Sequence, residues 1–404
     1  MLRINSRAII LIDQLVLSGS NFIINIILAR FLGIESFGVF SLLWITMLFF
    51  LSVQQAAIIA PMYSIEGQNN FDKKSIFQVN FFQIILTLIS TFFLILFLSI
   101  FSFFSNVIDI GFNLIPAIIF CSIYLLHDYA RRVLFLAKKY IQALIIDLMA
   151  YFGFLIVLLT VNKEILNSYN IFLIPTFTFL LAILYYLKTT KFYFVNKDKK
   201  KFNEYWEFSK WLSLSNILQW VSGNLFVLVG TFTIGPWVAG IIRIFQNLLG
   251  VMSVIFHALE NYIPIEAAKL YSSNGLKIMK KFLITVFGQG VLFLIILIFS
   301  VRFLKPDFII GKIYGTQYAD YSYLLYIYLV VYFFIFSNLL LRYFLRTLKN
   351  TKVIFNSYVV SFMLCSIIAW PLVENYRMDG IVLGTLFSQI SIFMYLLSKS
   401  LKYD

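Results

Sequence analysis

The clearest structural signal in the chain is AIILIDQLVLSGSNFIINIILARFLGIESFG, residues 8–38. Residues 8–32 are almost continuously apolar, and a short break between Gly33 and Gly38 precedes a second apolar run that ends at Pro61. A helix needs about 20 mostly apolar residues to cross the hydrocarbon core of a membrane. The stretch therefore predicts two consecutive transmembrane helices joined by a tight connection.

The composition extends this prediction to the whole chain of 404 residues. Apolar residues make up 61% and charged residues 12% of it, whereas soluble proteins average about 45–50% and about 25%. A soluble protein of this size could not cover its surface with so few charges. Long continuous apolar runs also exclude the alternating strands of a β-barrel. We therefore expect an all-α integral membrane protein with about 12 transmembrane helices.

Apolar length and charged or turn-rich breaks place the individual spans. We expect them at residues 8–32, 37–61, 76–104, 111–135, 141–161, 165–187, 208–233, 237–263, 281–304, 321–345, 352–373 and 379–399. Residues 1–187 would form an N-terminal six-helix lobe, residues 188–207 a basic cytoplasmic linker loop, and residues 208–404 a C-terminal six-helix lobe.

An internal duplication favours this division into two lobes. Several residues recur at an offset close to half the chain length: Gly33 and Gly38 as Gly235 and Gly240, Pro61 as Pro264, and Ser18-Gly19 as Ser222-Gly223. The alternative is coincidence, because these residue types commonly interrupt spans. As parallel repeats, the two lobes would be related by an axis along the membrane normal and would enclose a central cavity.

Basic residues are distributed unequally between the two sides of the predicted spans. If the N-terminus is cytoplasmic, most of the 32 lysines and arginines fall in inside segments, and only a few, such as Arg302 and Lys305, fall outside. Positive charge concentrates in cytoplasmic loops of membrane proteins. We therefore expect both termini in the cytoplasm, and the net charge of +14 does not indicate a nucleic-acid partner.

Polar residues recur at helical spacing inside three spans. They are Arg243, Gln246, Gly250, Ser253, His257 and Glu260 in the eighth span, Arg7, Gln14, Ser18, Asn21 and Asn25 in the first, and Ser209, Ser213, Asn216, Gln219 and Gly223 in the seventh. Spacings of three and four residues place each set on one helix face. Such a face either lines a hydrated cavity or forms hydrogen bonds with a neighbouring helix. The occurrence of three aligned sets favours the cavity.

These polar faces supply the candidate substrate-binding residues: Arg243, Arg7, Gln14, Asn21, Asn25, Arg30, Asn216, Gln219, Gln246 and Ser253. Arg243 is the first candidate, because it lies well within its span and a guanidinium binds anionic oxygens in a bidentate manner. Arg30 lies on the opposite helix face from Asn21. It either contacts the substrate or extends to the lipid headgroups.

Other ionisable residues within spans are candidates for ion coupling: Asp128, Asp147, His257 and Glu260. Ionisable groups at membrane depth are costly and mark ion pathways or partners. For Asp128 the alternative is a pair with Arg131 or Arg132. For Asp147 the alternative is a satisfied buried acid.

Sequence motifs of catalysis are absent. The chain has no G-x-x-x-x-G-K-[ST] nucleotide loop and no G-x-S-x-G nucleophile motif. Its two histidines fall in different halves, so no histidine-based metal cluster is expected. The sequence therefore predicts a transporter without a cofactor or metal rather than an enzyme.

Four segments resemble one family of transporters. SGSNFIINIILARFLGIESFGVFSL (Ser18–Leu42) resembles the first two helices of bacterial polysaccharide or O-antigen repeat-unit flippases of the Wzx type, which carry Ala-Arg-x-x-Gly followed by Phe-Gly there. Gly311–Leu329, Leu345–Leu364 and Met378–Gln389 resemble their later helices. These proteins belong to the multidrug/oligosaccharidyl-lipid/polysaccharide (MOP) exporter superfamily. Where the family often has an acid in the seventh helix, this chain has Ser222-Gly223-Asn224.

The resemblance implies that the protein moves an undecaprenyl-diphosphate-linked oligosaccharide from the inner to the outer leaflet of the bacterial cytoplasmic membrane by alternating access. It also implies membrane lipid, a polysaccharide polymerase and a chain-length regulator as partners. Three alternatives stay open at this point: a cation-coupled drug exporter of the same superfamily, a membrane-embedded polysaccharide polymerase, and a scaffold that transports nothing.

Overall fold

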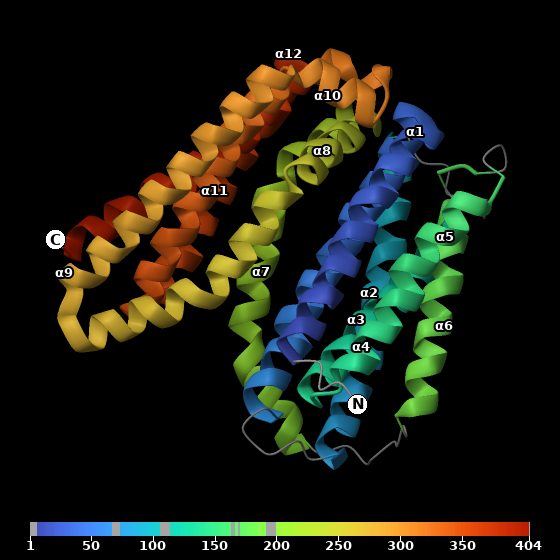
Figure 1. The fold of residues 1–404 in the computed structure, drawn as a ribbon, viewed down its shortest axis with the longest axis horizontal. Coiled ribbons are helices and arrows are strands. Elements are labelled where there is room, and N and C mark those ends of the chain that lie inside the picture. The colour runs from blue at the N-terminus through green and yellow to red at the C-terminus, as the bar shows by residue number, and fades with distance from the viewer. Residues whose placement is uncertain are drawn as a thin grey trace. The chain divides into compact units, whose positions relative to one another are not determined.

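A computed structural model describes residues 6–66, 73–105, 114–162, 166–168, 170–190 and 199–403. Over these residues the chain is helical and has no strand (Figure 1). It folds as two compact units, Met1–Ile217 and Leu218–Asp404. We call them the N-terminal unit and the C-terminal unit.

The N-terminal unit is a bundle of helices that run side by side (Figure 1). Its helices are α1 (Ser6–Gln54), α2 (Lys73–Ser105), α3 (Ile115–Leu136), α4 (Tyr140–Asp147), α5 (Gly153–Thr160), α6 (Leu173–Thr189) and the first part of α7 (Lys199–Thr233). Three π-helical segments, Gln55–Ile59, Met62–Glu66 and Leu148–Phe152, extend or join these helices, and a short 3₁₀ turn, Asn170–Phe172, precedes α6.

The C-terminal unit begins with the rest of α7. It continues with α8 (Trp237–Leu248), α9 (Gly250–Leu304), α10 (Pro306–Ile313), a 3₁₀ segment (Thr316–Tyr321), α11 (Leu324–Thr347), α12 (Thr351–Ser400) and a final 3₁₀ turn (Leu401–Tyr403). Helix α11 packs against both α9 and α12.

Three long helices each consist of two arms joined at a residue with a positive φ angle. These residues are Gly33 in α1 (φ 74°), Gly275 in α9 (φ 78°) and Arg377 in α12 (φ 52°). Glycine adopts positive φ at little cost, because it lacks the Cβ that makes this region unfavourable for other residues. The connection expected around Gly33 is therefore confirmed, and α1 holds the first expected span and most of the second, which continues into the π-helical segment Gln55–Ile59.

The structure confirms the all-α prediction and corrects three details of it. Among the described helices, eight are long and apolar enough to cross a membrane, and several of these contain two arms. Residues 199–207 of the expected linker loop already belong to α7. The expected outer loop after Leu304 contains α10. The eighth span is not one helix, because α8 ends at Leu248 and α9 starts at Gly250.

Aromatic packing forms much of the core of the N-terminal unit. The ring of Phe120 meets Phe179 edge-on at 5.3 Å between centroids, and Phe40 stacks on Phe172 at 5.1 Å. The two cysteines of the chain, Cys121 in α3 and Cys365 in α12, are both fully buried and are not joined by a disulfide. They behave as small apolar side chains of each core, as lone buried cysteines usually do.

Large apolar side chains also cover much of the outer surface. Phe303 is 87% exposed and Ile367 74% exposed, and both belong to helices long enough to span a bilayer. In water such a surface would be strongly unfavourable, whereas lipid tails solvate it. The exposed surface is therefore that of a protein that lies in a membrane.

In the C-terminal unit, α7 and α12 approach closely at Gly384. A Cβ atom at Gly384 would overlap the ring of Phe226, which is almost fully buried. We expect Gly384→Ala to lower the free energy of unfolding by about 1–3 kcal/mol, because the ring has no space into which to move. Gly288→Ala is the matched control, since nothing lies within 4 Å of its added Cβ. Thermal unfolding in detergent measures both, and equal melting temperatures would contradict the prediction.

Candidate functional site

A buried ion-pair cluster lies within the N-terminal unit. Arg131 of α3 donates from Nε to Asp147 Oδ2 and from Nη2 to Asp13 Oδ2, each at 2.5 Å. Asp13 lies on α1 and Asp147 at the end of α4, so the arginine joins three helices. We call Asp13, Arg131 and Asp147, together with the adjoining His127, the Arg131 cluster.

The Arg131 cluster is almost entirely removed from solvent. Asp13 and Asp147 are 1% and 0% exposed, and Arg131 is 7% exposed. His127 Nε2 lies 3.5 Å from Asp147 Oδ1 and 3.4 Å from the carbonyl oxygen of Ile146. Asp13 Oδ1 and Asp147 Oδ1 are buried without a hydrogen bond from a described residue. Two carboxylates facing one guanidinium leave this site with an excess negative charge when both are ionised.

A second polar network surrounds Asp128 on the neighbouring face of α3. Asp128 Oδ2 accepts hydrogen bonds from Gln55 Nε2 (2.7 Å) and Gln54 Nε2 (3.2 Å), and Arg132 Nε lies 3.4 Å from Asp128 Oδ1. Gln83 of α2 donates to Gln54 Oε1 at 2.9 Å. Of the two partners expected for Asp128, the structure selects Arg132, while Arg131 pairs with other carboxylates.

Helical spacing explains why α3 serves two separate networks. Residues four apart share a helix face, so His127 and Arg131 point toward α1 and α4. Asp128 and Arg132 share another face, on which Asp128 meets the end of α1 and the π-helical segment that follows it. Each network also adjoins a π-helical segment, Gln55–Ile59 or Leu148–Phe152. Such segments occur frequently at functional sites. The Arg131 cluster and the Asp128 network are therefore the most specialised polar regions described in this unit.

The polar face predicted on the first span is only partly in contact with other elements. Gln14 Nε2 donates to Ser18 Oγ at 3.1 Å, and Asn25 Nδ2 donates to the carbonyl of Asn21 at 2.7 Å. Both bonds stay within α1. Asn25 is buried and Gln14 and Asn21 are half-buried. The side chain of Arg7 lies outside the described residues.

The first part of α7 brings one candidate from the seventh span to the second span. Asn216 Nδ2 donates to the carbonyl oxygen of Ser52 at 3.3 Å. Further along α7, Gln219 is exposed. Arg30, on α1, is also exposed.

The break between α8 and α9 divides the polar face predicted on the eighth span. Leu249 leaves the helical conformation (φ −86°, ψ 9°). The next residue is Gly250, and glycine has a low helix propensity. Arg243 is buried on α8 at 8% exposure, and Gln246 Nε2 donates to Tyr328 Oη of α11 at 3.2 Å. The side chains of Ser253, His257 and Glu260 lie outside the described residues.

Sequence reasoning missed two features of this arrangement. The first is the Arg131 cluster, because Asp13 lies off the polar face of its span and Arg131 pairs with residues of two other helices. The second is a cluster of hydroxyl groups in the C-terminal unit. Ser222 of α7 contacts both arms of α12, through Ser361 at 3.1 Å and Ser388 at 3.3 Å. The available signal for the Arg131 cluster was the presence of an ionisable residue inside several of the predicted spans.

A scan against protein-family models finds no match, and no curated protein sequence matches the chain. Solved structures do match along nearly the whole length. A multidrug resistance MATE family transporter of the MOP superfamily, in its inward-facing conformation, is similar with a TM-score of 0.73 at 10% identity over 98% of both chains. The lipid II flippase MurJ in an inward closed conformation gives 0.70 at 15% identity over 98% of this chain and 87% of that one.

A third similar structure comes from Pyrococcus furiosus. It is a MOP superfamily transporter described by the reverse polarity of its binding pocket, and it gives a TM-score of 0.59 at 10% identity over 98% of this chain and 92% of that one. Each of these matches covers 98% of this chain and therefore extends over both units. The chain therefore has the fold of the MOP superfamily transporters.

Proposed function

We propose that the protein is a flippase that moves an undecaprenyl-diphosphate-linked oligosaccharide from the inner to the outer leaflet of the bacterial cytoplasmic membrane. The MOP fold supports transport, and one similar structure is a flippase for a lipid-linked molecule, lipid II. The segments that resemble repeat-unit flippases support an oligosaccharide-linked lipid as the substrate. Alternating access of the two units would move the head group while the lipid tail stays in the bilayer.

Arg243 is the observation that carries this proposal. It is a buried arginine on α8, whose other buried residues are apolar. Charged contacts are stronger in such an environment than in water, because the local dielectric constant is low. A diphosphate supplies two anionic groups whose oxygens suit bidentate contacts. The substrate-contact roles of Gln14, Asn21, Asn25, Asn216 and Gln246 remain part of this proposal, because amides suit sugar hydroxyls.

The same proposal assigns ion coupling to the Arg131 cluster. A coupling cation taken up at Asp147 would cancel the excess negative charge that the two carboxylates leave beside Arg131. Neutralising a buried charge is strongly favourable. The π-helical segment Leu148–Phe152 begins directly after Asp147, and such segments occur frequently at functional sites.

The decisive experiment locates the lipid-linked units that accumulate when the protein is depleted. Spheroplasts are treated with a membrane-impermeant reagent that modifies sugars, then lysed and treated again. We expect the units to be protected until lysis, because flipping has stopped and they remain in the inner leaflet. Units that react before lysis would contradict the proposal and favour a polymerase, which acts after flipping.

A cation-coupled drug exporter is the second candidate, since several similar structures are MATE transporters. Three carboxylates of the N-terminal unit argue against it. Asp13 and Asp147 are closed off from solvent around Arg131, and Asp128 pairs with Arg132, whereas a site for organic cations needs acidic groups that the cation can reach. Increased drug sensitivity of the depleted strain, with lipid-linked units still reaching the outer leaflet, would favour the exporter.

A further inference from the structure

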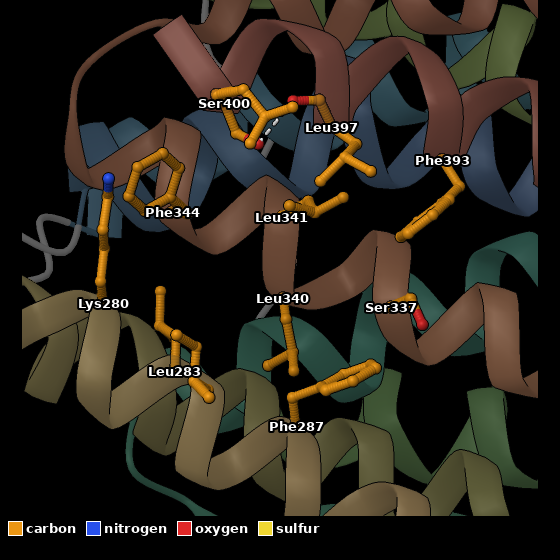
Figure 2. Close-up of a pocket in the computed structure, with 12 residues that line it drawn as sticks. Lys280, Leu283, Phe287, Ser337, Leu340, Leu341, Phe344, Phe393, Leu397 and Ser400 are labelled. Atoms are coloured by element: carbon orange, nitrogen blue, oxygen red, sulfur yellow. Dashed lines mark hydrogen bonds between the residues drawn. The ribbon is translucent and has the colours of Figure 1, made fainter. Parts of the chain in front are cut away.

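One end of the C-terminal unit contains an apolar cavity beside a basic one. The apolar cavity has a volume of about 310 Å³ and lies between the second arm of α9, α11 and the end of α12. Leu283, Phe287, Leu340 and Leu397 line it, and Lys280 is the charged residue among its lining side chains (Figure 2). Apolar cavities of this kind hold apolar ligands rather than ordered water.

The apolar cavity opens on the surface of the unit. Ile284 and Leu401 border it and are 68% and 57% exposed. In a bilayer this opening faces lipid, so a hydrocarbon chain can enter the cavity sideways from the membrane. Figure 2 shows the Lys280 side chain at one end, with its ammonium group beside Phe344, and mostly leucine and phenylalanine along the rest of the cavity, with Ser337 and Ser400 among them.

The basic cavity has a volume of about 450 Å³ and lies between the two ends of α12. Its lining includes Lys352, Lys399 and Lys402, two asparagines and two tyrosines, and none of the described residues that line it is acidic. Three ammonium groups around one cavity attract an anion, and clustered lysines near a membrane surface favour the binding of anionic lipid.

The 3₁₀ turn Leu401–Tyr403 lies between the two cavities, and contacts of Tyr403 fix its position. Lys280 Nζ donates to the carbonyl oxygen of Tyr403 at 2.9 Å, and Asn350 Nδ2 donates to Tyr403 Oη at 2.9 Å. The Phe344 and Tyr403 rings lie 6.2 Å apart. An amphipathic ligand can therefore place its anionic head among the lysines and its tail in the apolar cavity, across one turn of helix.

We infer that this end of the C-terminal unit is a binding site for an anionic phospholipid of the adjacent leaflet. The match of charge and polarity identifies the occupant: a phosphate group for the lysines and an acyl chain for the apolar cavity. The positive-inside distribution places these lysines at the cytoplasmic leaflet. The site lies within one unit and does not depend on the proposed flippase activity.

Lipid binding to the purified, delipidated full-length protein tests this site by native mass spectrometry. The probes are dioleoylphosphatidylglycerol, dioleoylphosphatidylcholine with the same acyl chains, and inorganic phosphate. We expect the anionic lipid to bind about tenfold or more tightly than the other two. Equal binding of both lipids would overturn the assignment, and so would displacement of the anionic lipid by millimolar phosphate, which would indicate a site for a free anion.

Two variants and one control locate the binding. The triple variant Lys352→Gln, Lys399→Gln and Lys402→Gln should weaken binding of the anionic lipid about tenfold or more. The charge-matched control changes Lys269, Lys277 and Lys281, exposed lysines of α9 that line neither cavity, and should bind within about twofold of the unchanged protein. An equal loss in the control would mean that bulk charge, not this site, attracts the lipid.

Ile284→Trp tests the apolar cavity separately. Ile284 is exposed at the mouth of the cavity, so a larger side chain can occupy the opening without displacing the core. We expect the variant to keep its melting temperature without lipid and to lose the anionic lipid. Unchanged lipid binding would exclude the acyl-chain part of the site.

Discussion

Replacing Arg131 by glutamine should abolish accumulation of the folded protein in the membrane. The substitution leaves Asp13 and Asp147 buried without the guanidinium that now contacts both at 2.5 Å. Removing one partner of a buried ion pair costs about 3–5 kcal/mol, which is a large part of the total stability of most proteins. Membrane yield and the melting temperature in detergent measure this effect.

Two further variants separate charge from packing. Arg132→Gln is the matched control, because Arg132 is one-third exposed and faces a single carboxylate at 3.4 Å. Its effect should be less than about 1 kcal/mol. The triple variant Arg131→Met, Asp13→Asn and Asp147→Asn removes the buried charges together and should recover most of the stability. If Arg131→Gln is as stable as Arg132→Gln, the ion pairs do not contribute as the structure indicates.

The triple variant also tests ion coupling. A protein that folds with neutral groups at these positions has no excess charge for a coupling cation to cancel, so we expect it to reach the membrane and to transport no substrate. Full transport by the triple variant would show that the Arg131 cluster only stabilises the fold and that ion coupling takes place at another site.

Replacing Arg243 by alanine should stop flipping while leaving membrane insertion intact. The side chain is buried on a short helix, and its removal takes away the cationic partner proposed for the diphosphate. The accumulation of lipid-linked units protected inside spheroplasts measures the loss, and immunoblotting of membranes measures insertion. We expect a decrease in flipping of about 100-fold or more, as follows from losing about 3 kcal/mol of a charge-assisted contact.

Arg243→Lys and Arg30→Ala provide the comparison. Lysine keeps the positive charge but lacks the planar fork that binds two oxygens together, so partial activity is expected. Arg30 is exposed on α1, and its replacement should reduce flipping only if it contacts the substrate. Normal flipping by Arg243→Ala would remove the basis on which we assign an anionic head group.

Much of the fold follows from local features of the sequence. Apolar length alone places the helices, and Gly33 marks the connection within α1 because the positive φ angle there favours glycine. Arg377 joins the arms of α12 with a positive φ and no glycine; the sequence offers no comparable signal at that position. The end of α8 at Leu248 was also missed, because Leu249 and Gly250 lie inside a continuous apolar run.

The candidate site was predicted less completely, and for a physical reason. A helical projection compares residues on one helix, whereas Asp13, Arg131 and Asp147 belong to three helices and meet only after packing. Asp13 lies off the polar face of its own span, and its side of α1 is the one that contacts Arg131 of α3. Pairing between distant residues depends on which helices are neighbours and on how each is rotated about its axis. The periodicity of a single span gives no information about either.

The burial of Cys121 and Cys365 has a practical consequence for labelling. Both thiols are fully enclosed, and thiols in such environments are inert to reagents in water. The native protein therefore serves directly as the background for site-directed thiol chemistry. A single cysteine introduced at position 352 or 305 can be labelled with a membrane-impermeant maleimide to show on which side of the membrane that position lies. The native cysteines, and the packing they provide, can stay in place.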